Sequence, residues 1–182
     1  TVTESPTGAE ATALYADNIK YLNLISVEEF AATIEAYTYP AQFAENDGSA
    51  VPETGVMIGQ QPRRLFGLAY RTRMGNDVEG TAYGYKLHLV YNAVAAPSEK
   101  AYSTINDTPE AITSSWEVST TPVPVTGFSP TATLVIDSTL VAEADLAELE
   151  DMLYGTVGQD PSLPAPDDVI AIFAAALTVA TP

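Results

Sequence analysis

The 182-residue sequence lacks cysteine entirely and contains a single histidine. Without cysteine the chain can form no disulfide framework, no thiolate zinc site and no thiol-based active site. Long hydrophobic runs are also missing, because the longest, residues 169–180, includes a threonine and falls short of the roughly 20 residues that a bilayer requires. These absences exclude disulfide-stapled scaffolds, histidine-cluster metal sites and a membrane-spanning helix.

Positive charge is scarce and unevenly placed. The chain has 24 acids and 7 bases, a formal net charge of −17, and all 7 bases lie in residues 1–100. A surface this acidic repels phosphate and therefore disfavours a role in binding DNA or RNA. At 46% hydrophobic residues the chain is too apolar to be intrinsically disordered. Only 17% of residues are charged, and the resulting neutral surface favours burial against other subunits.

The length fits one domain, which we place at residues 13–182, after a flexible polar N-terminal arm at residues 1–12. The arm has neither the basic start nor the apolar stretch of a secretory signal. A first residue other than Met indicates a start that was processed off or is missing from the sequence. Within the domain, residues 40–62 are rich in turn formers, and we predict a long loop that becomes ordered on assembly.

Alternating apolar residues predict about six strands. The patterns cover residues 13–27, 30–36, 63–74, 81–92, 111–120 and 131–137. The best local prediction is a hairpin of the third and fourth strands, turning at Gly75-Asn76-Asp77. One face of its second strand is aromatic and apolar, formed by Tyr83, Tyr85, Leu87, Leu89 and Tyr91. The proline-containing segments 122–124 and 128–130 cannot lie in central strands.

Helical spacing replaces the strand pattern near residue 142. Leu146, Leu149, Met152 and Leu153 predict an amphipathic helix over residues 142–154, ended by Gly155. The opposite face carries five acids: Glu143, Asp145, Glu148, Glu150 and Asp151. The last three lie near the helix C-terminus, where the helix dipole disfavours each by a few tenths to about 1 kcal/mol, so local stability did not place them there. A short apolar helix is predicted from Val169, with Asp167 or Asp168 as N-cap.

Together these elements predict a mainly β (α+β) fold, an antiparallel β-sandwich or half-barrel with one flanking amphipathic helix. A doubly wound α/β fold is excluded because the strands follow one another without intervening helices.

Motifs for catalysis are missing. His88, the only histidine, lies within a predicted strand, and no serine sits in a Gly-x-Ser-x-Gly turn, so we interpret His88 as structural or interfacial. The segment Gly55–Gly59 lacks the following lysine of a phosphate-binding loop. We therefore predict no enzyme activity, no catalytic residues, no cofactor and no metal site. A carboxylate pair acting on a glycoside stays open, because 24 acids offer many pairs.

A series of short motifs, unspecific singly, resembles the major tail tube proteins of long-tailed bacteriophages in its order and spacing. The motifs include Tyr15-Ala-Asp-Asn18, Gly59-Gln-Gln-Pro-Arg63, Phe66-Gly-Leu-Ala-Tyr-Arg71, Tyr83-Gly-Tyr-Lys-Leu-His-Leu-Val-Tyr91, Leu149-Glu-Asp-Met-Leu-Tyr-Gly155 and Leu163-Pro-Ala-Pro-Asp-Asp168. The resemblance covers about residues 13–172.

This resemblance implies a β-sandwich subunit that closes into hexameric rings, which stack into a tube conducting the genome into the host. It implies a location in the virion, after assembly in the host cytoplasm, and no catalytic residues. The implied partners are further copies of the chain and other tail proteins, such as the tape-measure protein and the tail terminator. Genome DNA would pass without specific binding, as expected for an acidic lumen.

Two sets of candidate residues follow. We hypothesise that Arg63, Arg64, Arg71 and Arg73 pair with acids of adjacent subunits, and that Glu35 and Glu117 face the lumen. The alternative function is a soluble or secreted β-sandwich binding module, of the adhesin or carbohydrate-binding type. Its support is the aromatic face with Tyr83, Tyr85 and Tyr91, which could stack on sugars, although core packing explains such a face better.

Overall fold

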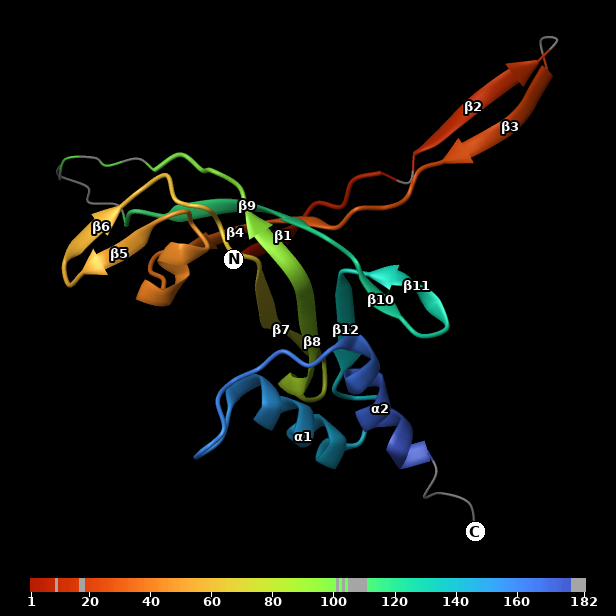
Figure 1. Ribbon diagram of the computed structural model, residues 1–182. Helices are drawn as coiled ribbons and strands as arrows, with labels where there is room; N and C mark the ends of the chain where they lie inside the picture. The colour runs from red at the N-terminus through yellow and green to blue at the C-terminus, as the bar shows by residue number, and fades with distance from the viewer. Residues whose placement is uncertain (9, 17–18, 101, 103, 105–110, 178–182) are drawn as a thin grey trace. The chain divides into compact units, whose positions relative to one another are not determined.

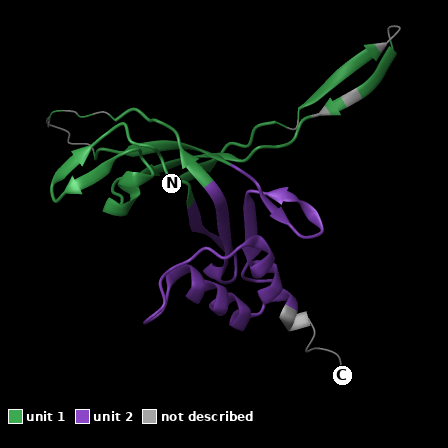
Figure 2. Cartoon of the chain, viewed as in Figure 1, with its two compact units in different colours: residues 1–66, 93–120 green, residues 67–92, 121–182 purple. Residues whose placement is uncertain are grey.

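The computed structural model describes residues 1–8, 10–16, 19–100, 102, 104 and 111–177. In this part of the chain the strands are paired antiparallel and accompanied by two α-helices, which confirms the mainly β fold class (Figure 1). The chain forms two compact units (Figure 2). Unit 1 comprises residues 1–66 and 93–120, and unit 2 comprises residues 67–92 and 121–182. The β-sandwich arrangement stays a prediction, as does the single domain over 13–182.

Unit 1 is built on a sheet with one buried face. Its strands are β1 (Val2–Glu4), β4 (Ala31–Ala36), β9 (Ser114–Thr120) and the last residues of β8 (Gly80–Ala95), in the order β1-β4-β9-β8. Ile34 of β4 lies opposite Trp116 of β9, which is buried. Strand β1 lies within the segment predicted as a flexible arm. The structure corrects that prediction for residues 2–4, whose backbone pairs with β4 at the edge of the sheet.

An aromatic cluster covers the buried face of this sheet. The indole of Trp116 packs edge-on against the rings of Tyr39 and Phe43, each with centroids 5.1 Å away. Phe43 in turn packs against Phe66 at 5.4 Å. Phe43 belongs to the 3-10 helix η1 (Ala41–Glu45), so the segment after β4 closes the core of unit 1.

The segment 40–62 therefore differs from the long unstructured loop predicted for it. Besides η1 it contains a hairpin of β5 (Ala50–Glu53) and β6 (Val56–Ile58). The turn signals that suggested a loop occupy the connections: Gly48 and Gly55 both have positive φ angles, of 75° and 83°. The prediction failed because these elements are too short to produce a periodic pattern.

The strand predicted over residues 13–27 is in fact a hairpin. It consists of β2 (Ala11–Ala16) and β3 (Ile19–Ile25), which pair with each other antiparallel and with no other strand in the described residues. The two residues between them lie outside the part of the chain that the structure describes.

Unit 2 contains the hairpin that the sequence predicted most clearly. Strands β7 (Phe66–Asn76) and β8 are paired, and the side chain of Asn76 accepts backbone hydrogen bonds from Val78 and Glu79 at the turn. Strand β12 (Thr133–Asp137) pairs with the other edge of β8. The predicted alternation along β8 is confirmed, because Leu87, Leu89 and Tyr91 are buried in the core of this unit.

The proline-containing segments of unit 2 form a separate ribbon, β10 (Val123–Val125) with β11 (Phe128–Thr131). They take no part in the larger sheet, as the missing backbone donor of proline predicted.

Two helices complete unit 2, where the predicted architecture had one flanking helix. Helix α1 (Glu143–Tyr154) confirms the amphipathic prediction: Leu146 and Leu149 are buried, and Gly155 ends it with a φ of 76°. Helix α2 (Pro166–Leu177) begins three residues before Val169. Neither predicted N-cap is correct, because Asp167 and Asp168 lie in its first turn.

Replacing the buried leucine of α1 tests this core. Leu149→Ala is expected to lower the free energy of unfolding by about 2–5 kcal/mol, because the lost contacts leave a cavity that the packing cannot fill. The matched control is Leu140→Ala at a side chain that is 82% exposed, where the change should stay within about 0.5 kcal/mol. Urea denaturation followed by circular dichroism measures both, and equal effects would contradict the assigned core.

Candidate functional site

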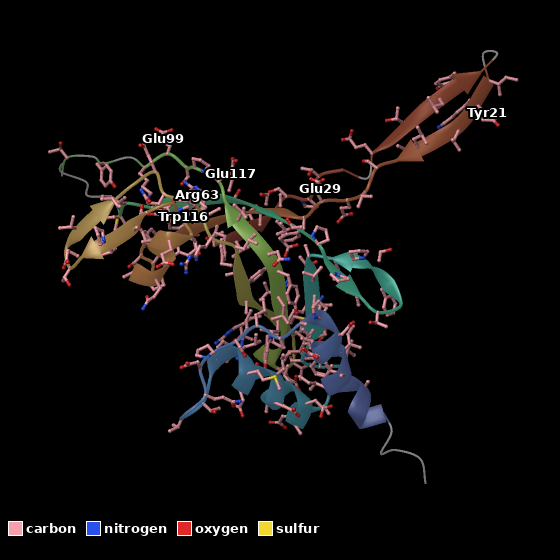
Figure 3. The ribbon with its side chains drawn as sticks, in the orientation of Figure 1. Tyr21, Glu29, Arg63, Glu99, Trp116 and Glu117 are labelled. Carbon is pink, nitrogen blue, oxygen red and sulfur yellow. The ribbon has the colours of Figure 1, made fainter. Side chains whose placement is uncertain are left out.

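The hairpin of β2 and β3 exposes large apolar side chains on both strands. Tyr21, labelled in Figure 3, is 79% exposed, and Ile19 and Tyr15 are about as open at 70% and 69%. The other exposed members are Leu14, Leu22 and Leu24. A two-stranded hairpin standing alone is marginally stable in water, and covering each such side chain contributes about 1.5–3 kcal/mol. This apolar ribbon therefore has the character of a contact surface.

The outer face of the unit 1 sheet is polar and carries no base. Thr33 lies opposite Glu117, and Glu35 lies opposite Ser115, so both predicted lumen acids share this face (Figure 3 labels Glu117). Glu35 and Glu117 are exposed. The residues on this face of β1, β4 and β9 are Thr3, Ala31, Thr33, Glu35, Ser115, Glu117 and Ser119. The result is a hydroxyl-rich surface with two negative charges.

Arg63 is held inside unit 1 by a buried carboxylate that sequence reasoning did not single out. Its guanidinium donates to the carbonyl of Ala95 at 2.7 Å and lies 3.8 Å from Asp47. Asp47, with a side chain only 5% exposed, also accepts from the indole nitrogen of Trp116 at 3.0 Å and from Lys100. The hydrogen bond to Asp47 raises the pKa of Lys100. We call Asp47 with Arg63, Lys100 and Trp116 the Asp47 cluster; Figure 3 labels two of its members, Arg63 and Trp116.

Arg64 makes a different kind of pair. It lies 2.8 Å from Glu45, but both side chains are more than half exposed, so the pair contributes little.

Arg71 is packed between two tyrosines of unit 2. Its guanidinium carbon lies 4.7 Å from the ring centre of Tyr85 and 5.1 Å from that of Tyr154, within cation–π range. It donates to the Tyr154 hydroxyl at 3.1 Å and pairs with Glu150 at 2.8 Å. Burial alone would lower the pKa of Arg71, but these two contacts outweigh it and raise the pKa. Glu150 also accepts from the Tyr85 hydroxyl at 2.5 Å.

The four predicted interface arginines are thus not gathered at one site. Arg63 and Arg64 belong to unit 1, whereas Arg71 and Arg73 belong to unit 2. The first three pair with acids of their own unit, while exposed Arg73 makes no ion pair with any residue that the structure describes. Pairing with acids of adjacent subunits stays a prediction, and Arg73 is the member most available for it.

The aromatic face and the histidine of β8 have structural partners. Tyr91 is buried and Tyr85 is hydrogen-bonded to Glu150, which leaves Tyr83 as the most open of the three tyrosines and no sugar-stacking platform among them. The His88 ring stacks on Tyr70 with centroids 4.6 Å apart, and its Nε2 lies 2.9 Å from the Thr72 hydroxyl.

In the described ranges, no three His, Asp or Glu side chains come together as a metal site would require. Over the same ranges, neither helix reaches the length and apolarity needed to cross a bilayer.

Comparison with known proteins gives no match: no family model, no curated protein and no solved structure corresponds to this chain.

A conservative substitution in the Asp47 cluster is expected to lower the free energy of unfolding substantially. Asp47→Asn keeps the size of the side chain but removes the charge facing Lys100 and Arg63, so we expect a loss of about 1.5–3 kcal/mol in unfolding free energy. Glu45→Gln, which breaks the exposed pair with Arg64, is the control and should cost under about 1 kcal/mol. Chemical denaturation at neutral pH compares them, and an Asp47 variant as stable as the control would show that the cluster is not stabilising.

The tyrosine paired with Glu150 predicts a stability loss in alkali. Burial, the hydrogen bond to Glu150 and the charge of Glu150 raise the pKa of Tyr85 to about 12, from an ordinary value of 10.0. Its contribution to stability is complete below pH 10 and is lost as the pH rises through 12. Between these values, unfolding free energy should fall less steeply in Tyr85→Phe than in the unmodified chain. Parallel pH-dependences of the two proteins would refute the assignment.

Proposed function

We propose that this chain is a structural subunit that assembles with copies of itself into hexameric rings, and that the rings stack into the tail tube of a bacteriophage virion. The tube conducts the genome and carries out no catalysis. The resemblance of the motifs supplies the form of the assembly, and the geometry of unit 1 supports self-association independently.

The apolar ribbon of β2 and β3 is the observation that carries the proposal. Six large apolar side chains on a lone hairpin are costly in a monomer, because each leaves its surface in water. If the hairpin packs on the next copy, these side chains are buried. The hairpin also gains the packing against another element that an isolated hairpin lacks. Repetition of one such contact around an axis closes a ring.

The outer face of the unit 1 sheet fits the lining of a genome conduit. DNA adheres to proteins mainly through lysine and arginine contacts to its phosphates, which release counterions. The face with Glu35 and Glu117 carries hydroxyls and carboxylates, and β1, β4 and β9 contain no base. Phosphates passing such a surface meet weak repulsion and no adhesive pair.

Electron microscopy of the purified chain in negative stain tests the assembly. We expect rings or tubes from the unmodified chain and dispersed particles from the double variant Ile19→Asp with Tyr21→Asp, because two charges within the apolar ribbon oppose its burial. Circular dichroism should show that the variant keeps the same fold, since both side chains are exposed already.

Val157→Asp with Val78→Asp is the matched control, because it places two negative charges on exposed valines outside the ribbon and should leave assembly unchanged. Small uniform particles from the unmodified chain at every concentration would overturn the proposed function. Normal rings from the double variant would show that the ribbon is not part of the interface between copies.

A further inference from the structure

A pocket of about 370 Å³ lies on unit 2 along the β7–β8 hairpin. Its lining residues are Arg71, Arg73, Thr81, Ala82, Gly84 and Tyr85. The two arginines are two residues apart in one strand and so point to the same face. Unit 2 has only 3 bases against 11 acids, so two of its three positive charges line this one pocket.

The guanidinium of Arg71 is fixed in orientation, but not all of its hydrogen-bond donors are used. Its contacts with Tyr154 and Glu150 use Nε and Nη2, and the rings of Tyr85 and Tyr154 hold the guanidinium plane. Nη1 makes no hydrogen bond to a described residue, so part of the donor fork stays open to a ligand. Holding a guanidinium in place beforehand lowers the entropy lost when it binds.

Arg73 supplies the uncompensated charge. It is exposed and has no acid partner in the described chain, in a unit where acids outnumber bases. Because Glu150 neutralises Arg71, the three groups together carry one net positive charge. That charge matches a single carboxylate better than a phosphate, which carries close to two negative charges near neutral pH. The planar fork of Arg73 suits the two oxygens of a carboxylate, and Nη1 of Arg71 supplies one further donor.

We propose that this pocket binds the carboxylate of an acidic side chain from a second copy of the chain, with Arg73 as the main contact and Arg71 as the oriented second donor. The identity of the partner rests on the proposed self-assembly. A second copy is the occupant that the charges favour, because each copy carries 24 acids and only 7 bases.

The first test measures assembly of the full-length chain by sedimentation and negative stain. Arg73→Gln should raise the concentration needed for assembly by about tenfold, the factor expected for losing one charge-assisted hydrogen bond. Lys86→Gln is the matched control: it removes the same charge from an exposed residue of unit 2 outside the pocket, and should have little effect. Arg73→Lys keeps the charge without the planar fork and should lie between them.

The second test examines the pocket without assembly, using the non-assembling Ile19→Asp, Tyr21→Asp chain or, if the unmodified chain does not assemble, that chain itself. The probe is N-acetyl-glutamate amide, which has one carboxylate, and its neutral counterpart is N-acetyl-glutamine amide. Nitrogen-15 NMR of arginine side chains should show saturable shifts with the glutamate compound only. Arg73→Gln should weaken binding at least tenfold, and Lys86→Gln should not. Inorganic phosphate is titrated in parallel.

The outcomes separate the two proposals. A chain that never assembles overturns the proposed function, and the NMR titration then decides the carboxylate pocket alone. Rings that form equally well in Arg73→Gln and Lys86→Gln overturn the contact between copies while leaving the ring proposal standing. Tighter binding of phosphate than of the glutamate compound, or no binding of either, overturns the carboxylate assignment.

Discussion

The two units depend on one continuous strand, β8, which supplies buried side chains to both. Leu87, Leu89 and Tyr91 enter the core of unit 2, and Ala93 and Ala95 are buried in unit 1. Large residues thus give way to small ones where β8 pairs with β9. Since alternate residues of a strand face opposite sides, a shift of one position would turn these side chains to the other face of the strand. The register of β8 therefore determines which of its side chains enter the core of each unit.

The few bases of this chain include three that pair with half-buried or buried acids, two in unit 1 and one in unit 2. In the Asp47 cluster, two bases and an indole satisfy one buried carboxylate, which joins the segment before β5 to the core around Trp116. In unit 2, the position of Glu150 is explained by its partners. Glu150 lies near the C-terminal end of α1, where the helix dipole disfavours a negative charge, but it pairs with Arg71 and Tyr85. Tertiary ion pairing outweighs the small cost of the helix dipole.

The proposed tail tube gives one explanation for features that are otherwise unrelated. In that proposal the apolar hairpin is covered by apolar surface of another copy, the arginine pocket takes a carboxylate of another copy, and the polar face without bases lets the phosphates of DNA pass without adhering. Copies of a single acidic chain around a DNA path would satisfy all three. The low fraction of charged residues is consistent with this, because neutral surface is inexpensive to bury.

Elements whose patterns are long and local could be predicted from the sequence alone: the β7–β8 hairpin, the buried face of β8, helix α1 with Gly155 at its end, and the mainly β class. Period and turn chemistry suffice there, because neighbouring residues carry the information. Three features needed the tertiary structure: the segment 40–62 folds over the Trp116 core, Asp47 is buried, and among the described residues Arg71 has an acid partner whereas Arg73 has none. These depend on residues far apart in the chain, such as Asp47 with Lys100 and Arg71 with Glu150. A local sequence period cannot predict these contacts, because the two residues of each pair meet only when the elements between them pack.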